Sequence, residues 1–270
     1  MFNAITIIIP TKGRLHNQKT LSQLAPKLLE RTIIVVEPDE WFDHYMEYGN
    51  KCKVYSLPNT IKGIANKRQH CIDVCKTEYL FMLDDDLAFF KRQEGSVKLD
   101  KCSDDNQYNM FSLLLSWMDT DGYPLVGVSA RQGNNHTSEF YKEATRQMNF
   151  HGIHIPPFRK LNLKFNSITL MEDFHLVLSL LTQGIPNRVL YGYCWNQLGS
   201  GAEGGCSTYR TPELQKECAE QLEFDYPDFV TVVEKTNKTG WKGMQTRTDV
   251  RVQWKKAYEW GIKNENSNSK

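Results

Sequence analysis

Four short runs of apolar, mostly β-branched residues alternate with helical stretches in the first third of the chain. The runs are AITIIIP (4–10), TIIVVEP (32–38), CKVYSL (52–57) and YLFML (79–83). A continuous apolar run is typical of a strand that is buried on both faces, as strands are in a parallel sheet. Strands and helices that alternate at this spacing indicate βαβ units, so we predict an α/β fold with a doubly wound sheet.

The segments between and after these strands carry helix signals. Acids before an apolar stretch that stops at Gly184 favour a helix, and so do Thr211 and Pro212 at the start of a run with one apolar face. We expect helices at 17–30, 62–76, 109–118, 171–184 and 211–223, and further strands at 124–130, 149–155 and 188–195. The expected architecture is therefore a sheet with helices on both of its faces.

Composition excludes several classes of protein. The chain has 270 residues and a net charge of +1, so no overall field draws it to nucleic acid or to a membrane, although local patches still can. Its seven cysteines are odd in number and include no C-x-x-C pair, which favours reduced thiols in a cytosol. No segment reaches the roughly 20 apolar residues of a membrane helix. We expect a cytoplasmic protein with no membrane partner.

Three adjacent carboxylates, Asp84, Asp85 and Asp86, follow the predicted strand 79–83 directly. Crowded carboxylates at the end of a buried strand cost free energy unless a cation lies beside them. Ligands of α/β sheets bind beyond the carboxyl ends of the strands, and such carboxylates suit Mg²⁺ or Mn²⁺ that also holds phosphate oxygens. The alternative is a solvated acidic turn, which the apolar sequence on both sides makes less favourable.

Cationic side chains fall at two places from which they could reach a ligand at these strand ends. Arg68 stands in line with Ile64 and Ile72 at helical spacing, so it either extends from the edge of an apolar stripe into solvent or points at the aspartates. Lys12 and Arg14 follow the first strand. They form either a solvated basic turn or contacts to a bound ligand, and their position directly after the strand favours the second interpretation.

Three motifs in a fixed order resemble those of glycosyltransferases with the GT-A fold. TIIIPTKGR (6–14) resembles the first strand and nucleotide-binding loop, GIANKRQHCIDVCKTEYLFMLDDD (63–86) the helix, strand and D-x-D segment, and MEDF (171–174) the later acidic motif. Together the motifs span residues 4–185. The details are most similar to the TET-associated glycosyltransferases, which tailed phages use to put sugars on hydroxymethylated DNA bases. The resemblance implies a Rossmann-like mixed sheet with helices on both faces.

The resemblance also implies a nucleotide-sugar donor, usually a UDP-sugar, and a Mn²⁺ or Mg²⁺ ion. The ion would bridge Asp86 and the donor diphosphate, with Asp84 nearer the ribose or sugar and a second candidate ligand. The donor-binding residues would be Thr11, Lys12, Arg14, Arg68, Asp84 and Asp85. GT-A enzymes often add a C-terminal histidine to the metal, but no histidine follows His175 in this chain.

The acidic motif implied by the resemblance supplies the catalytic carboxylate. Asp173 would be the general base that deprotonates the acceptor hydroxyl, with Glu172 as the reserve candidate. The alternative is that both acids only stabilise the helix dipole at the start of 171–184. A reaction that retains the configuration of the sugar would weaken the role of Asp173.

Charge is strongly segregated in the C-terminal third. Residues 232–258 contain seven lysines and arginines against two acids, interleaved with Trp241, Trp254 and Tyr258, whereas residues 213–228 hold six acids and one lysine. A basic run with aromatic residues suits contacts to a phosphate backbone and stacking on bases. The alternative is an amphipathic helix with a merely solvated basic face. The expected DNA-binding residues are Lys242, Arg247, Arg251, Lys255 and Lys256.

These patterns predict a GT-A core at 1–198, a glycine-rich loop with a helical and basic extension at 199–263, and a disordered tail at 264–270. The expected reaction is metal-dependent transfer of a sugar from a UDP-sugar to 5-hydroxymethylcytosine in phage DNA, in the host cytoplasm, with arabinose slightly favoured over glucose. A glycosyltransferase that acts on a surface glycan or protein is one alternative. A non-catalytic module that binds a nucleotide sugar or DNA is another. Nothing in the sequence indicates an oligomeric state.

Overall fold

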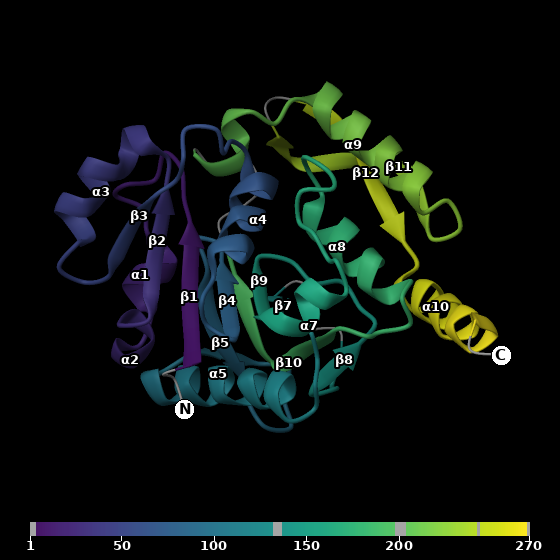
Figure 1. Cartoon of the computed structure of the whole chain (residues 1–270), viewed down its shortest axis with the longest axis horizontal. Coiled ribbons are helices and arrows are strands. Elements are labelled where there is room, and N and C mark those ends of the chain that lie inside the picture. Colours follow the sequence, from purple (N-terminus) through teal and green to yellow (C-terminus); the bar gives the residue numbers. More distant parts are fainter. Residues whose placement is uncertain (1–3, 132–136, 198–203, 242–243, 269–270) are drawn as a thin grey trace.

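A computed structural model describes residues 4–131, 137–197, 204–241 and 244–268 (Figure 1). The strands of its large sheet are β1 (Ile5–Pro10), β2 (Thr32–Val36), β3 (Lys53–Ser56), β4 (Tyr79–Leu83), β5 (Ala88–Arg92), β6 (Leu99–Lys101), β7 (Leu125–Ala130), β8 (Tyr141–Glu143), β9 (Phe150–His154) and β10 (Arg188–Asn196). Their order is β3-β2-β1-β4-β9-β7-β10-β5-β6, with β8 paired to β10. Strands β3, β2, β1 and β4 are parallel, whereas β9 is antiparallel to both of its neighbours. The predicted mixed sheet is therefore confirmed.

Two hydrophobic clusters form the core, one on each face of the sheet. In β1, Ile7 and Ile9 belong to one cluster and Ile8 to the other, because successive side chains of a strand point to opposite faces. All five residues of β4 are buried, which explains why its sequence is apolar without alternation. The polar side chains that follow these strands consequently emerge at one edge of the sheet.

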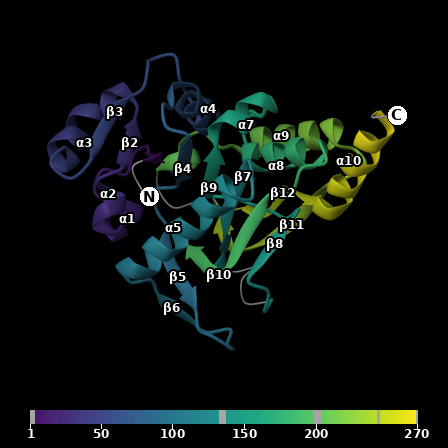
Figure 2. The same cartoon turned by 60° about the horizontal axis from the view of Figure 1, so that its bottom comes forward.

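Helices cover both faces of the sheet (Figures 1 and 2). The helices of the described residues are α1 (Lys19–Gln23), α2 (Pro26–Leu29), α3 (Trp41–Tyr48), α4 (Ile64–Val74), α5 (Asp104–Asp119), α7 (Ile155–Lys160), α8 (Glu172–Leu181), α9 (Pro212–Asp225) and α10 (Trp254–Asn268). Helices α4, α7 and α8 pack into one cluster, and α1, α2 and α5 into the other. The single helix expected at 17–30 is split into α1 and α2, because Pro26 disfavours a helical conformation at the preceding residue.

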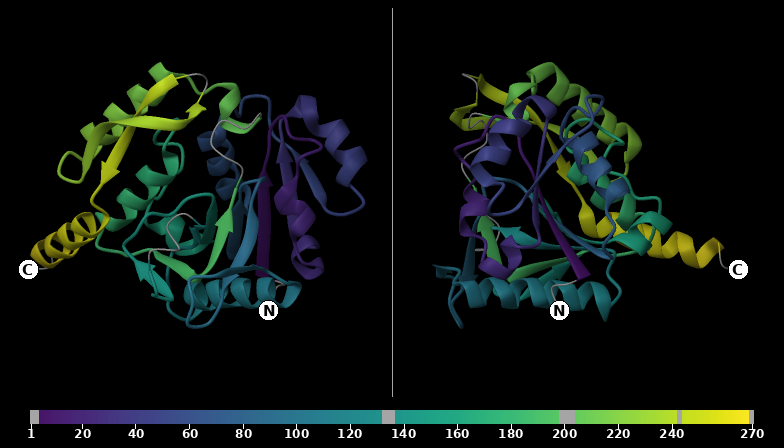
Figure 3. Two further views of the ribbon diagram at one scale, coloured as in Figure 1. Left: turned by 180° about the vertical axis from the view of Figure 1, so that it is seen from behind. Right: turned by 60° about the vertical axis from the view of Figure 1, so that its left-hand side comes forward.

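The C-terminal extension contains a β-hairpin, made of β11 (Val230–Trp241) and β12 (Met244–Val252), which packs against α9. Figures 1 and 3 show the hairpin and α9 beside α8, over the end of the molecule where the strands β1, β2 and β4 finish. The helical interpretation of residues 232–252 is therefore wrong. Threonine and valine recur at every second residue over 246–252, a pattern that favours a strand over a helix.

Two further expectations concern the loop and the tail. The tail expected to be disordered is helical as far as Asn268, because a helix that has already formed is extended at little cost. Of the glycine-rich segment 199–207, residues 199–203 lie outside the described residues, and Gly205–Thr208 form a short 3₁₀ helix, η3. No described helix is both long and apolar enough to cross a membrane. The domain boundary at 198 stays a prediction.

Candidate active site

A cavity of about 730 Å³ opens at the carboxyl ends of β1, β2 and β4. This is the edge at which α/β sheets bind their ligands. Every side chain predicted to bind the donor, bind the metal or act as the base lines this cavity: Thr11, Lys12, Arg14, Arg68, Asp84, Asp85, Asp86, Glu172 and Asp173. The fold therefore brings together residues that are up to 162 positions apart in the sequence, although their individual roles stay predictions.

The carboxylates of Asp85 and Asp86 are buried against the loop that follows β1. Asp85 accepts a hydrogen bond of 2.5 Å from the Thr11 hydroxyl and a second from the Arg14 guanidinium. The same Nη1 atom of Arg14 lies 3.1 Å from an oxygen of Asp86. One arginine therefore supplies a positive charge to two of the three carboxylates.

A single arginine does not neutralise this group fully. Burial, and after it the negative charge of Asp84, raise the pKa of Asp86 to about 6, because Arg14 offsets only part of their effect. Burial also raises the pKa of Asp85, against the charge of Arg14. The negative charges of Asp85 and Asp86 are therefore only partly offset by Arg14, and a further cation beside them would be favourable.

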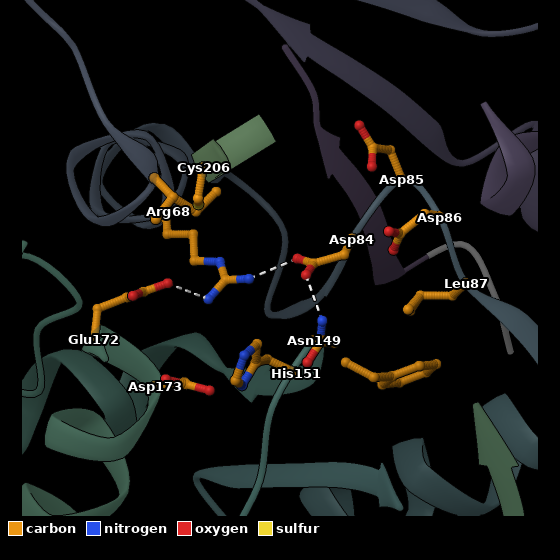
Figure 4. Close-up of polar contacts among 12 residues, drawn as sticks. Arg68, Asp84, Asp85, Asp86, Leu87, Asn149, His151, Glu172, Asp173 and Cys206 are labelled. Atoms are coloured by element: carbon orange, nitrogen blue, oxygen red, sulfur yellow. Dashed lines mark hydrogen bonds and ion pairs between the residues drawn. The ribbon is translucent and has the colours of Figure 1, made fainter. Parts of the chain in front are cut away.

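Arg68 connects the carboxylate triplet to the acidic start of α8 (Figure 4). Its guanidinium donates to Asp84 and to Glu172, at 2.6 Å in each case, and the residue is only 4% exposed. Asn149 donates to the other oxygen of Asp84, also at 2.6 Å. Burial disfavours the charged form of Arg68, but Asp84 and Glu172 outweigh it and raise its pKa. Arg68 is thus a buried, permanently charged link and not a solvated arginine.

Glu172 and Asp173 differ in what they contact. Glu172 is buried and occupied by Arg68. Asp173 accepts a hydrogen bond of 3.0 Å from the backbone N–H of Phe174, and no other hydrogen bond to it is found among the described residues. Burial raises the pKa of both carboxyl groups. Of the two, Asp173 is therefore the one with capacity to accept a proton from a substrate.

The backbone that presents these acids is strained. Met171, the residue that precedes α8, has a φ of 62°, in the left-handed region that residues other than glycine rarely adopt. Asn149, the partner of Asp84, has a φ of 60°. Residues held in this conformation are concentrated at functional sites. Both positions line the cavity.

Three lysines converge on Glu37, an acid that no motif in the sequence singled out. Glu37 follows β2, is 3% exposed, and lies 2.8 Å from Lys12, 2.9 Å from Lys67 and 3.0 Å from Lys62. Burial raises the pKa of Glu37, but hydrogen bonds from the lysines outweigh burial and lower it to about 2. A positional signal was available, because Glu37 follows its strand as directly as Asp84 follows β4.

Arg146 was also missed. Its guanidinium lies over the ring of Phe174, 4.7 Å from the centroid, and lines the cavity. Burial dominates the raised pKa of Asp173, while the charges of Arg68 and then Arg146 oppose it. Arg146 lies in an irregular segment between β8 and β9, where no periodic pattern marks it.

The described end of the glycine-rich segment closes one side of the cavity. Gly205 donates a backbone hydrogen bond of 2.8 Å to the carbonyl of Lys12. A Cβ atom at Gly204 would lie 2.7 Å from Cγ of Arg14, and the φ of Gly204 is 88°. A side chain at Gly204 would therefore displace the arginine that holds Asp85 and Asp86.

The predicted DNA-binding residues do not form one group. Arg247, on β12, lines the cavity beside Asp249. Arg251 is exposed on the same strand, and Lys255 and Lys256 are exposed near the start of α10. Lys242 lies outside the described residues. Contact with DNA stays a prediction for all five residues.

The residues fit a divalent cation in part. Among the described residues, no group of three or more histidine, cysteine, aspartate or glutamate side chains is arranged to hold a metal ion. The raised pKa of Asp86 shows that Arg14 offsets its negative charge only in part, and Asp84 lies close to it. Two carboxylates can serve as ligands if phosphate oxygens of a bound donor or water complete the shell. The metal therefore stays a prediction.

Comparison with known proteins places this chain among enzymes. The TET-Associated Glycosyltransferase family matches residues 5–205. The "Beta-glucosyl-HMC-alpha-glucosyl-transferase" of Enterobacteria phage T2 is 24% identical over 208 residues, which are 72% of each chain. The protein of the same name from Enterobacteria phage T6 is 24% identical over 238 residues, 83% of this chain and 82% of its own.

The fold is also found among solved structures. S. aureus TarS 1-349 in complex with UDP-GlcNAc matches with a TM-score of 0.52 and 13% identity. The match covers 83% of this chain and 66% of that one, so this chain spans about two thirds of its length. The likeness supports the GT-A fold that the sheet order already indicates. On the extent of the family match, the chain belongs to the TET-associated glycosyltransferase family and is a glycosyltransferase with the GT-A fold.

Proposed function

We propose that this protein transfers a sugar from a UDP-sugar to a hydroxyl group on a modified cytosine of DNA. The observation that carries the proposal is one cavity that joins the charged side chains at the ends of β1, β2 and β4 to Asp173 at the start of α8. A sugar nucleotide and an acceptor hydroxyl must meet in one place for transfer to occur. The cavity offers groups for both.

The cluster around Glu37 supports uridine as the nucleoside. The edge of uracil presents a carbonyl, an N–H and a second carbonyl in a row. Glu37 can accept from the N–H, and two of its lysine neighbours, Lys12 and Lys62, can donate to the carbonyls. Cytosine presents an amino group and an unprotonated nitrogen instead, so the acceptor oxygen of Glu37 would face a second acceptor. The TarS structure of the same fold is in complex with UDP-GlcNAc.

Asp84 and Asp86 are the proposed ligands of a Mn²⁺ or Mg²⁺ ion. Bound there, the cation would neutralise the charge of the diphosphate leaving group. In the protein alone these two carboxylates contact arginines instead: Asp86 lies 3.1 Å from Arg14, and Asp84 lies 2.6 Å from Arg68.

In the proposed reaction Asp173 removes the proton of the acceptor hydroxyl. The hydroxyl oxygen forms a bond to the anomeric carbon, the bond from that carbon to the diphosphate breaks, and UDP leaves with the bonding electrons. Such a direct displacement inverts the anomeric carbon, so a donor of α configuration gives a β product. The phage relatives are named for an alpha-glucosyl transfer. An α product from an α donor would therefore contradict this role of Asp173.

The names of the same relatives support the acceptor and the sugar. They describe glucose transfer to hydroxymethylcytosine (HMC) that already carries a glucose. We therefore propose glucose ahead of arabinose, and two acceptors: 5-hydroxymethylcytosine and its β-glucosylated form. Both present a primary or ring hydroxyl to Asp173.

A mass measurement separates these possibilities. The protein is incubated with Mn²⁺, UDP-glucose, UDP-arabinose or UDP-GlcNAc, and duplexes that contain cytosine, 5-hydroxymethylcytosine or β-glucosyl-hydroxymethylcytosine. The DNA is then digested to nucleosides, and the masses of the nucleosides are measured by mass spectrometry. We expect a gain of one hexose on one of the modified bases and none on cytosine. Hydrolysis of the donor by water without a DNA product would indicate a working donor site and favour a glycan or protein acceptor, and donor binding without turnover would favour a non-catalytic module.

A further inference from the structure

The hairpin β11–β12 has two chemically different faces. Its strands pair Val230 with Val252 and Val232 with Val250, and these valines pack into the hydrophobic cluster shared with α8 and α9. Because side chains alternate along a strand, the residues between them share the opposite face. That face carries Lys235, Arg247, Asp249 and Arg251.

The backbone behind this polar face is firmly held. The side chain of Gln215, on α9, donates to the carbonyl of Thr248 at 3.2 Å. The side chain of Glu223, also on α9, accepts from the backbone N–H of Val232 at 2.8 Å. Helix α9 therefore supports the hairpin from its apolar side, and the polar face keeps a defined position relative to α8.

Arg247 and Asp249 reach the catalytic cavity from this face. Asp249 accepts from Arg247 at 3.1 Å and from Lys235 at 2.9 Å. The side chain of Asp249 is 15% exposed and that of Arg247 is 32% exposed. A guanidinium has five N–H donors, and the structure gives that of Arg247 one hydrogen bond among the described residues. One carboxylate thus orients two cations, and most donors of Arg247 remain available to a ligand.

We propose that Arg247, oriented by Asp249, binds the phosphate beside the target nucleotide when the modified base enters the cavity. The inference rests on the proposed function. A base inside a duplex reaches an enclosed site by leaving the stack, and its flanking phosphates then follow it to the protein. The planar fork of an arginine pairs with a phosphate through two hydrogen bonds. Arg247 lies beyond residues 5–205, outside the part of the chain that the family match covers.

A chemical double-mutant cycle tests this contact. Each phosphate near the target base is replaced in turn by a neutral methylphosphonate, and transfer is measured with the wild type, Arg247→Ala and Arg251→Ala. We expect one methylphosphonate position to lower kcat/KM of the wild type by about 10-fold or more, the worth of a charged hydrogen bond. Arg247→Ala should show the same loss on normal DNA and no further loss at that position. Arg251→Ala, on the same face but outside the cavity lining, should keep the wild-type sensitivity.

Asp249→Asn tests the positioning role separately. The variant keeps the shape of the side chain but not its charge, so KM for DNA should rise several-fold while kcat and UDP affinity stay unchanged. A wild-type pattern of methylphosphonate sensitivity in Arg247→Ala would overturn the inference. If the wild type transfers sugar to no modified duplex, the proposed function itself has failed, and this outcome is distinct because it appears before any variant is made.

Discussion

The cavity at the carboxyl ends of the strands and the C-terminal region of the hairpin and α10 both carry many charged side chains, but these side chains differ in burial and pairing. Asp85, Asp86 and Arg68 are each less than 9% exposed, and each has an opposite charge within 3.1 Å. Arg251 and Lys255 are exposed instead. A buried charge is tolerable only when it is paired, whereas an exposed one is hydrated at little cost. The first arrangement suits a small ligand of fixed shape, and the second suits a long polyanion whose phosphates exchange with counterions.

Removal of the buried arginine Arg68 should have the largest effect, on the stability of the fold. Arg68→Met leaves Asp84 and Glu172 without their shared cation. We expect the free energy of unfolding to fall by about 3–5 kcal/mol, the usual cost of breaking a buried ion pair. Urea titration followed by circular dichroism measures it, with Arg251→Ala, expected within about 0.5 kcal/mol of the wild type, as the control from the hairpin. Equal stability of the two variants would contradict the proposed difference between the buried, paired charges of the cavity and the exposed charges near the hairpin.

The Glu37 cluster should determine the choice of nucleotide. Glu37→Gln presents an amide in place of the carboxylate that three lysines hold. We expect affinity for UDP to fall by about 10- to 100-fold, because a hydrogen bond to a charged group is removed. Calorimetric titration with UDP and CDP measures the preference, with Asp249→Asn as a control on the hairpin side of the cavity. An unchanged ratio of UDP to CDP affinity in Glu37→Gln would reject the assignment of uracil to this cluster.

The exposed lysines of α10 should act through salt. Replacement of Lys255 and Lys256 by alanine is expected to weaken DNA binding at low salt. It should also flatten the dependence of log K on log salt by about one unit for each DNA phosphate that the variant no longer neutralises. Fluorescence anisotropy across salt concentrations measures the slope. UDP affinity, measured in parallel, should not change, since neither lysine lines the cavity. An unaltered slope would indicate that these lysines are only solvated and do not contact DNA.

Arg146 should have the smallest effect, on pH dependence. Burial raises the pKa of Asp173, and the positive charge of Arg146 is one of the groups that oppose this. Removal of that charge raises the pKa further, so deprotonated Asp173 would appear only at higher pH. The acidic limb of the kcat profile of Arg146→Gln should therefore move to higher pH. Arg146→Lys keeps the charge and should keep the wild-type limb, and coincident profiles for Arg146→Gln and wild type would contradict the coupling.

Sequence patterns were informative where a functional residue directly follows a strand or opens a helix. Asp84, Lys12 and Asp173 could be found in this way, because sheet topology brings strand ends to one edge whatever the tertiary details are. Glu37 obeys the same rule and could have been included. Its lysine partners could not, since only the folded chain shows that Lys62 and Lys67 lie within 3.0 Å of it.

The hairpin and the irregular segment before β9 explain the remaining misses. The composition at 232–258 indicated a basic, aromatic surface, whereas the alternation of threonine and valine over 246–252 indicates the strand β12, which pairs with β11. Arg146 and Asn149 lie where the chain has neither helical nor strand periodicity. Their positions depend on tertiary packing, such as the contact of Arg146 with Phe174, which no local pattern encodes.

In the proposed reaction a sugar passes from UDP to a modified cytosine within one cavity, and Asp173 is the general base. The most direct measurement compares wild type and Asp173→Asn by the nucleoside masses released from a modified duplex after incubation with UDP-glucose and Mn²⁺. Asparagine has the same shape but cannot take up the proton, so turnover should fall by about 10²-fold or more while UDP affinity barely changes. Near-normal hexose transfer by Asp173→Asn would contradict the role of Asp173 as the general base. If transfer is lost in Glu172→Gln instead, that role belongs to Glu172.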